Sequence, residues 1–120
     1  MRKVTAEEWL AEGVRLYGDD KMKWRFKCPS CGYVASVQDW KDAGAKEGQI
    51  AFSCVGRNTG STKELGDKTG GPCNYAGGGL FRLNPVEVDD GQHKHSMFEF
   101  ADRQEGHAAE GELMEAEARQ

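Results

Sequence analysis

The sequence predicts a small α+β domain in which a few antiparallel strands carry an N-terminal helix and a short second helix. Its 120 residues are about the length of one domain. Only 38% of them are hydrophobic and 30% are charged, so the core must be small. Glycine occurs 16 times, about twice its average usage, which indicates many turns. Four cysteines offer a way to stabilise so small a core.

The first predicted element is an amphipathic helix over residues 6–17. Residues 5–8, TAEE, form a capping box at its start. Apolar residues then recur at roughly helical spacing, and Gly18 supplies a C-terminal stop. We expect Trp9 and Tyr17 to face the core.

The next stretch, residues 21–27, alternates strictly between basic and apolar residues, which predicts a half-buried strand. Its apolar side is expected to face inward and consists of Met22, Trp24 and Phe26. Its other side carries the cations Lys21, Lys23, Arg25 and Lys27. The cations form either a phosphate-contacting stripe or a solvated strand face whose lysines block unwanted pairing.

The remaining elements are shorter. A second capped helix of about two turns is predicted over residues 36–44, with Trp40 as its main apolar residue. Extended segments are predicted at residues 49–53, 80–83 and 86–88. The glycine-, serine- and threonine-rich residues 58–71 predict a surface loop, and residues 97–100 are expected to pack back onto the body.

We divide the chain into a folded domain, residues 1–100, and an acidic tail, residues 101–120, expected to be frayed or disordered. Residues 1–85 carry 13 Lys and Arg against 10 Asp and Glu, whereas residues 86–120 carry 3 against 10. The tail is interpreted as a solvated segment, a mimic of nucleic acid, or a handle for a basic partner. The net charge of −4 disfavours strong binding of duplex DNA by the whole chain.

Neither a membrane partner nor secretion is expected. No apolar stretch approaches the 18 or more residues that a membrane span needs. No apolar run follows the basic residues at the start of the chain, as a secretory signal would require. We therefore expect a cytoplasmic protein.

The most specific motif is C-P-S-C-G, which contains Cys28 and Cys31. A turn of this kind directs backbone amides toward the sulfurs and stabilises thiolates. Cys54 and Cys73 complete a C-x2-C-x22-C-x18-C spacing, which departs from the two compact knuckles of a standard zinc ribbon. We predict one structural Zn²⁺ held by all four cysteines, with no open position for catalysis. The strands would then be zinc-ribbon-like.

Three alternatives to zinc remain open. Disulfides are disfavoured in the cytosol, a redox C-x-x-C prefers a thioredoxin-like setting, and a rubredoxin-like iron site would need a second C-P-x-C-G half. Lys27 and Arg57 lie next to predicted ligands and are either cations beside the cluster or simply exposed. The histidines lie far from the C-P-S-C motif in sequence and are not expected to be ligands; they are His93, His95 and His107.

No catalytic motif is present. The glycine-rich residues 70–80 lack the G-x-x-x-x-G-K-[ST] pattern of a phosphate-binding loop, and neither G-x-S-x-G nor H-E-x-x-H occurs. We expect these glycines to carry the backbone close past the metal site and into the next strand. The protein is not expected to be an enzyme or to act on a small-molecule substrate.

Three sequence blocks occur in order: W-x-F-x-C-P-x-C-G at residues 24–32, F-S-C-x-G-R at 52–57 and G-P-C-N-Y-x-G-G-G-L-F-x-L-N-P-V at 71–86. Together they resemble a family of small uncharacterised phage and prophage zinc-binding proteins. The resemblance spans about residues 7–101. It implies a bacteriophage origin, a bacterial host cytoplasm and a shared four-cysteine site, but no activity.

Three functions follow from these features. The first is an interaction module that binds a host or phage protein, for instance a component of a defence system, through the tail or aromatics near Tyr33 or Tyr75. The second is nucleic-acid binding, with Tyr33 or Trp40 stacking on bases and the phosphates contacted by Lys21, Lys23, Arg25 and Lys27. The third is metal handling, redox or other catalytic chemistry.

Overall fold

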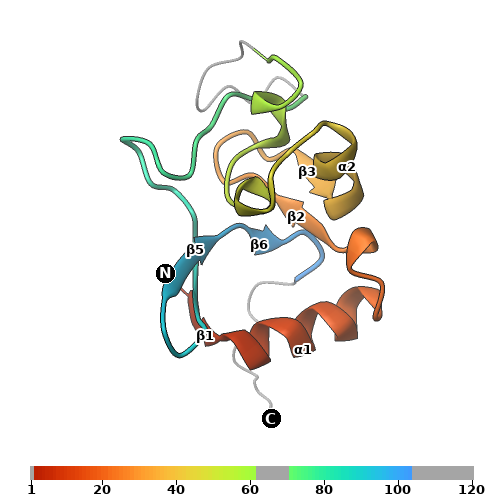
Figure 1. Cartoon of the computed structure of the whole chain (residues 1–120), viewed down its shortest axis with the longest axis vertical. Coiled ribbons are helices and arrows are strands. Elements are labelled where there is room, and N and C mark those ends of the chain that lie inside the picture. The colour runs from red at the N-terminus through yellow and green to blue at the C-terminus, as the bar shows by residue number, and fades with distance from the viewer. Residues whose placement is uncertain (1, 62–70, 104–120) are drawn as a thin grey trace.

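The computed structural model describes residues 2–61 and 71–103 of the chain (Figure 1). Within them the predicted α+β class is confirmed, because two α-helices accompany two small sheets. The helices are α1 (Ala6–Tyr17) and α2 (Val37–Asp42). The strands are β1 (Arg2–Thr5), β2 (Arg25–Lys27), β3 (Val34–Ser36), β4 (Val86–Asp89), β5 (Lys94–Met97) and β6 (Glu99–Phe100). Single 3-10 turns lie at Lys21–Lys23, Glu47–Gln49 and Val55–Arg57.

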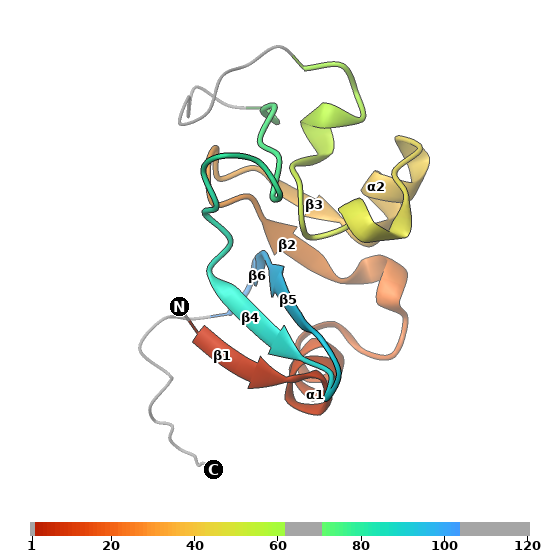
Figure 2. The same ribbon diagram turned by 60° about the vertical axis from the view of Figure 1, so that its left-hand side comes forward.

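The strands form one sheet in the order β1-β4-β5 and another in the order β3-β2-β6. Figure 2 shows the first sheet with β4 between β1 and β5. β4 pairs in parallel with β1, which corrects the expectation of antiparallel strands alone. The sequence did not reveal β1 because a strand of four residues, the last of which is the cap of α1, is too short to show a period. One residue, Phe98, separates β5 from β6 and so connects the two sheets.

Both helices begin where their caps predict. The Thr5 hydroxyl accepts a hydrogen bond from the Glu8 amide at 3.1 Å, and the Glu8 carboxylate accepts one from the Thr5 amide at 2.8 Å. Ser36 and Asp39 form the same reciprocal pair at the start of α2. The helix predicted over residues 6–17 is therefore confirmed, and the second is confirmed with a slightly earlier end.

The core is built mainly from aromatic rings. Phe100 is 2% exposed and lies at its centre, with its ring 4.3 Å from that of Trp9 and 4.9 Å from that of Phe26. Trp40 and Phe98, whose ring centroids are 6.0 Å apart, extend this packing toward α2. The prediction that residues 97–100 pack back onto the body is confirmed.

Three predicted strands are wrong in whole or in part. The Asp20 carboxylate accepts a hydrogen bond from the Met22 amide and caps a 3-10 turn, so the strand predicted at 21–27 is only Arg25–Lys27. Residues 49–53 contain a turn instead of a strand, and Ala51 has a left-handed φ of 57°. Residues 80–83 pair with no strand in the described part of the chain.

Ion pairs hold the last described residues against α1. Glu12, whose side chain is 11% exposed, contacts Arg2 at 2.8 Å, Arg103 at 3.2 Å and Arg15 at 3.6 Å. Asp102 pairs with Arg25. Asp102 and Arg103, which the sequence assigned to the tail, therefore contact the folded domain, and the rest of the predicted tail, residues 104–120, lies outside the described residues.

Replacing Glu12 with Gln is expected to lower the free energy of unfolding by about 2 kcal/mol. The variant removes the negative charge that these arginines share, and hydrogen bonds to charged groups contribute roughly 1.5–3 kcal/mol. Urea denaturation measures the change. Glu7→Gln, on the exposed first turn of the same helix, is the matched control and should change stability by less than about 0.5 kcal/mol. Equal effects of the two variants would contradict the prediction.

Candidate metal centre

The first two cysteines lie on the connection between β2 and β3. The Cys28 amide donates to the Tyr33 carbonyl at 3.0 Å, and the Gly32 amide donates back to the Cys28 carbonyl at 2.9 Å. Gly32 adopts a φ of 80°, a conformation that glycine tolerates best. This tight turn brings the Cys31 side chain to the same side as Cys28, as the C-P-S-C-G motif predicts.

The structure brings all four predicted ligands together. The sulfur atoms of Cys28, Cys31, Cys54 and Cys73 all lie within 4.8 Å of one another. The cysteines are free of disulfides and at most 7% exposed. The Cys28 and Cys73 sulfurs are 3.9 Å apart, and those of Cys31 and Cys54 are 3.8 Å apart.

These spacings fit a tetrahedral metal site. Four sulfurs bound at about 2.3 Å from a central ion, as in zinc–thiolate sites, lie about 3.8 Å from one another. A disulfide would instead require a sulfur–sulfur bond of about 2.0 Å. The four buried sulfurs therefore form a cluster whose donors and dimensions suit a metal ion.

Backbone amides surround the sulfurs and favour their ionised form. The Ser30 amide donates to Cys28 Sγ at 3.4 Å, the Tyr33 amide to Cys31 Sγ at 3.4 Å, and the Cys73 amide to Cys54 Sγ at 3.3 Å. Hydrogen bonds of this kind stabilise thiolates, which are the forms that bind metals.

In the metal-free chain the thiols of Cys28, Cys54 and Cys73 differ in how readily they ionise. Hydrogen bonding with the Cys28 thiol, assisted by the Gly56 and Cys73 amides, lowers the pKa of Cys54 to about 5. The same bond to Cys54, together with burial, raises the pKa of Cys28, and burial also raises the pKa of Cys73. A divalent cation would remove this conflict by neutralising the neighbouring negative charges.

Cys54 and Cys73 lie on two segments whose backbones are in direct contact. The Cys54 amide donates to the Tyr75 carbonyl at 3.0 Å. A Cβ atom on Gly56 would lie 2.1 Å from the Cys73 carbonyl oxygen, and one on Gly77 would lie 2.1 Å from the Phe52 carbonyl oxygen. The expectation that glycines carry the backbone close past this site is thus confirmed. This contact replaces the second compact knuckle of a zinc ribbon.

Neither predicted neighbouring cation has a hydrogen bond to a cluster sulfur. The Arg57 guanidinium donates to the Asn74 carbonyl at 3.2 Å and to its side-chain oxygen at 3.1 Å. Arg57 therefore holds the chain beside Cys73. Lys27 is exposed and lies with Cys28 beside a small cleft.

The sequence missed the role of Tyr75. This residue was expected near an exposed contact surface, but it is 0% exposed. Its hydroxyl accepts a hydrogen bond from the Leu83 amide at 2.7 Å. Tyr75 therefore joins the cluster to residues 80–83, and only its position two residues after a ligand hinted at this.

The residues proposed for nucleic-acid binding do not form one surface strand. Arg25 is paired with Asp102, and the ammonium of Lys21 lies 6.0 Å from the centre of the Trp24 ring. Tyr33 is 37% exposed and accessible. Trp40 is 1% exposed and its indole donates to the Ser53 carbonyl at 3.0 Å, so its proposed stacking on bases is wrong. The cations Lys21, Lys23, Arg25 and Lys27 are all exposed.

The described histidines lie outside the cysteine cluster. His95 contacts the Asp90 carboxylate at 2.9 Å in the turn between β4 and β5, and the His93 ring lies nearby. His107 lies outside the described residues. Among the helices that the structure describes, none has the length and apolar composition needed to cross a membrane.

Comparison with known proteins assigns the chain to a family. The family model of VVA0879-like proteins matches residues 5–101, a range that contains all four cysteines and most of the described chain. No curated protein and no solved structure matches the chain. Because the matched range covers well over half of the sequence, this chain belongs to the VVA0879-like family.

Proposed function

We propose that this protein is an interaction module, stabilised by one structural Zn²⁺, that binds a host or phage protein in the cytoplasm of a bacterial host. The bacteriophage origin rests on the three sequence blocks described above. The observation that carries the binding role is a projecting apolar loop beside the cysteine cluster, residues 80–83. This loop supports recognition of another protein as the function of the chain.

Zinc is the metal that we assign to the cluster. Four buried thiolates fill a tetrahedral set and leave no position for water or substrate, which is the arrangement of structural zinc. Iron in a four-thiolate site is the alternative. We expect metal analysis of the protein purified from zinc- and iron-supplemented cells to find one equivalent of zinc in a colourless sample. A coloured protein containing iron would contradict this assignment.

The apolar loop is exposed to an extent that is unusual for its residue types. Leu80 is 91% exposed, Phe81 59% and Leu83 44%. Contiguous apolar surface on a small protein marks interaction sites. Figure 1 shows this segment, coloured green to teal, reaching away from the rest of the ribbon.

The loop is anchored at both ends. Cys73 belongs to the cluster on one side. On the other side the Asn84 amide group donates to the carbonyls of Phe52 and Ser96, both at 3.1 Å. The Tyr75 hydroxyl fixes Leu83 between these ends. A metal-anchored frame that presents apolar side chains loses little conformational entropy on binding.

A capture experiment tests the proposal. The tagged full chain is incubated with bacterial lysate, with and without nuclease, and retained proteins are identified by mass spectrometry. We expect one protein to be retained stoichiometrically in both cases. Replacing Leu80 and Phe81 with Ser should then weaken its binding about 30-fold or more, because the loss of even one central apolar contact costs about 2 kcal/mol.

Leu10→Ser is the matched control, because Leu10 on α1 is 42% exposed and lies outside the loop. It should leave capture unchanged. Equal capture by wild type and by the Leu80→Ser, Phe81→Ser variant would overturn the role of the loop. Recovery that collapses with nuclease would point to nucleic acid as the direct ligand.

Nucleic-acid binding is the second candidate, favoured by the exposed cations of residues 21–27. It predicts a steep fall of affinity with salt and loss of binding in the Lys23→Glu, Arg25→Glu variant. Fluorescence anisotropy with single-stranded oligonucleotides measures both effects. Unchanged binding by the variant would assign these cations to a solvated surface.

A further inference from the structure

We propose that an open cleft next to the apolar loop binds an acidic protein segment by taking up one of its apolar side chains. This inference rests on the proposed function and names the partner's chemistry. Hereafter "the cleft" means the space of about 630 Å³ between β5 and two irregular segments, residues 47–52 and 77–82. Its size lies within the range of roughly 300–1,000 Å³ that is typical of ligand sites.

The interior of the cleft is apolar. Trp9, Val88 and Met97 line it from the sheet side, and Ile50 and Phe52 line it from the opposite segment. These residues come from α1, β4, β5 and an irregular stretch, so the fold itself brings them together. An apolar side chain entering the cleft would gain about 25 cal/mol for each Å² removed from water.

Glycines keep the cleft open. Gly78 borders it, and the nearest atom to a Cβ placed there would be Phe52 Cζ, at the ordinary contact distance of 3.6 Å. Its backbone is not in the left-handed region. A Cβ at this position therefore has room, and it would contact Phe52, which also lines the cleft. This makes the cleft accessible to a partner and easy to fill by substitution.

The edge of the cleft favours a negatively charged partner. Arg82, Lys94 and His95 border it, against the single acidic residue Glu47. Among the described residues, neither Arg82 nor Lys94 belongs to an ion pair, whereas His95 contacts Asp90. Both cations are therefore available to a partner, on a chain whose net charge is −4.

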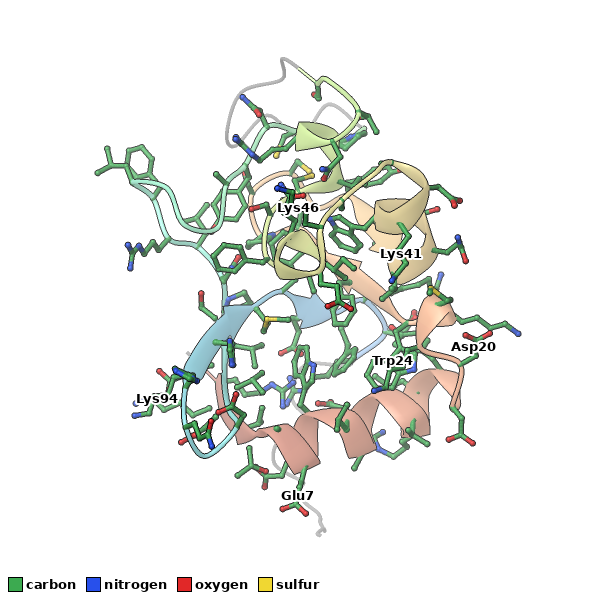
Figure 3. All side chains as sticks on the ribbon, viewed as in Figure 1. Glu7, Asp20, Trp24, Lys41, Lys46 and Lys94 are labelled. Carbon is green, nitrogen blue, oxygen red and sulfur yellow. The ribbon has the colours of Figure 1, made fainter. Side chains whose placement is uncertain are left out.

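A further cation lies beside the cleft. Lys46 directly precedes its lining residues and is exposed. Figure 3 shows Lys46 above the segment that contains β5 and β6, and Lys94 at the lower end of β5. Positive charge thus lies on both sides of an apolar interior. The complementary partner is a protein segment in which Glu or Asp flanks Leu, Met or Phe.

Short synthetic peptides test this assignment on the zinc-loaded full chain. One peptide carries a central Leu-Phe pair flanked by Glu, the second replaces the Glu residues with Lys, and the third replaces Leu-Phe with Ala-Ala. Titrations are followed by ¹⁵N–¹H NMR. We expect only the first peptide to bind appreciably, with the largest amide shifts at Gly77, Gly78, Ser96 and Met97.

Substitutions in the protein then test separately how the charge at the edge of the cleft and the shape of the cleft contribute to peptide binding. Arg82→Glu, Lys94→Glu should weaken binding of the acidic peptide at least about tenfold, and Gly78→Met should abolish it by filling the cleft. Lys23→Glu is the matched control, because Lys23 is exposed and does not line the cleft. Unchanged NMR spectra away from the substituted residues verify that each variant is folded.

Three results would overturn the inference. The first is equal binding of the acidic and basic peptides, and the second is amide shifts located away from the cleft. The third is amide shifts at the cleft that depend on protein concentration without peptide, which would assign the cleft to a second copy of the chain. If any of these happens while Phe81 is still required for capture of a lysate protein, the proposed function stands. If acidic peptides bind but no protein is captured through the loop, only the loop assignment fails.

Discussion

Removing the metal is expected to unfold the domain. Cys28 and Cys31 come from the β2–β3 connection, whereas Cys54 and Cys73 come from two distant segments, so the cluster joins three parts of the chain. Zinc binding in small four-ligand sites contributes roughly 10–16 kcal/mol at neutral pH. Domains of this size have net stabilities of only about 5–15 kcal/mol. The loss therefore exceeds what the aromatic core can replace.

Circular dichroism and one-dimensional NMR after treatment with a strong chelator measure this outcome, with residual zinc determined by mass spectrometry. We expect loss of dispersed amide signals and of the cooperative melt, and recovery of both when zinc is added back under reducing conditions. Chelator saturated with zinc beforehand is the control and should change nothing. A cooperative melt that is unchanged after verified metal removal would contradict a structural role for the metal.

Single cysteine substitutions should weaken the same metal site. Cys54→Ser removes a sulfur that lies 3.8 Å from that of Cys31 and accepts a hydrogen bond from the Cys73 amide. The remaining three sulfurs leave one position open, so zinc is held more weakly. Because thiols must lose protons to bind zinc, the variant should also release its metal at a higher pH than the wild type. Zinc release monitored with a chromogenic chelator across a pH series measures this shift.

Adding one methyl group beside the cluster is expected to cost about 3 kcal/mol, the upper end of the usual cost of overpacking. In Gly56→Ala the new Cβ would lie 2.1 Å from the Cys73 carbonyl oxygen, and in Gly77→Ala it would lie 2.1 Å from the Phe52 carbonyl oxygen. Both obstacles are backbone atoms, which no side-chain rotation can move away. The two segments must separate, and the cluster widens with them.

Thermal and urea denaturation of the zinc-loaded variants measures this cost, and a chelator competition measures the accompanying loss of zinc affinity. Gly48→Ala is the matched control, because a Cβ there meets no atom within 4 Å and its φ is not left-handed. It should change stability by no more than about 1 kcal/mol. Gly56→Ala and Gly77→Ala variants as stable as Gly48→Ala would show that the two segments can move apart freely.

The elements that the sequence predicted correctly are those whose determinants are local. The capping pairs Thr5–Glu8 and Ser36–Asp39 each join residues three positions apart and mark the starts of α1 and α2. The C-P-S-C-G turn likewise needs only its own amides and one glycine with positive φ. The inward direction of Trp24 and Phe26 also followed from alternation, although the first part of their strand is a 3-10 turn.

The strands predicted at residues 49–53 and 80–83 failed for a different reason. Apolar residues in a short run resemble a strand, but a strand exists only where a neighbour supplies hydrogen bonds. Ala51 instead lies in a turn, and its carbonyl accepts a hydrogen bond from the Phe98 amide at 2.7 Å. Leu80 and Phe81 meet no described strand and remain exposed.

The sequence by itself determined the two helices, the four candidate ligands and the need for glycine next to them. Only the tertiary structure decided that residues 52–56 and 73–77 run in contact, that Tyr75 is buried and that an apolar cleft with basic residues at its edge opens beside β5. Caps and turns depend on atoms a few residues apart, so the local sequence encodes them. Contacts between distant segments depend on which surfaces pack together in the fold, and no local sequence pattern encodes that packing.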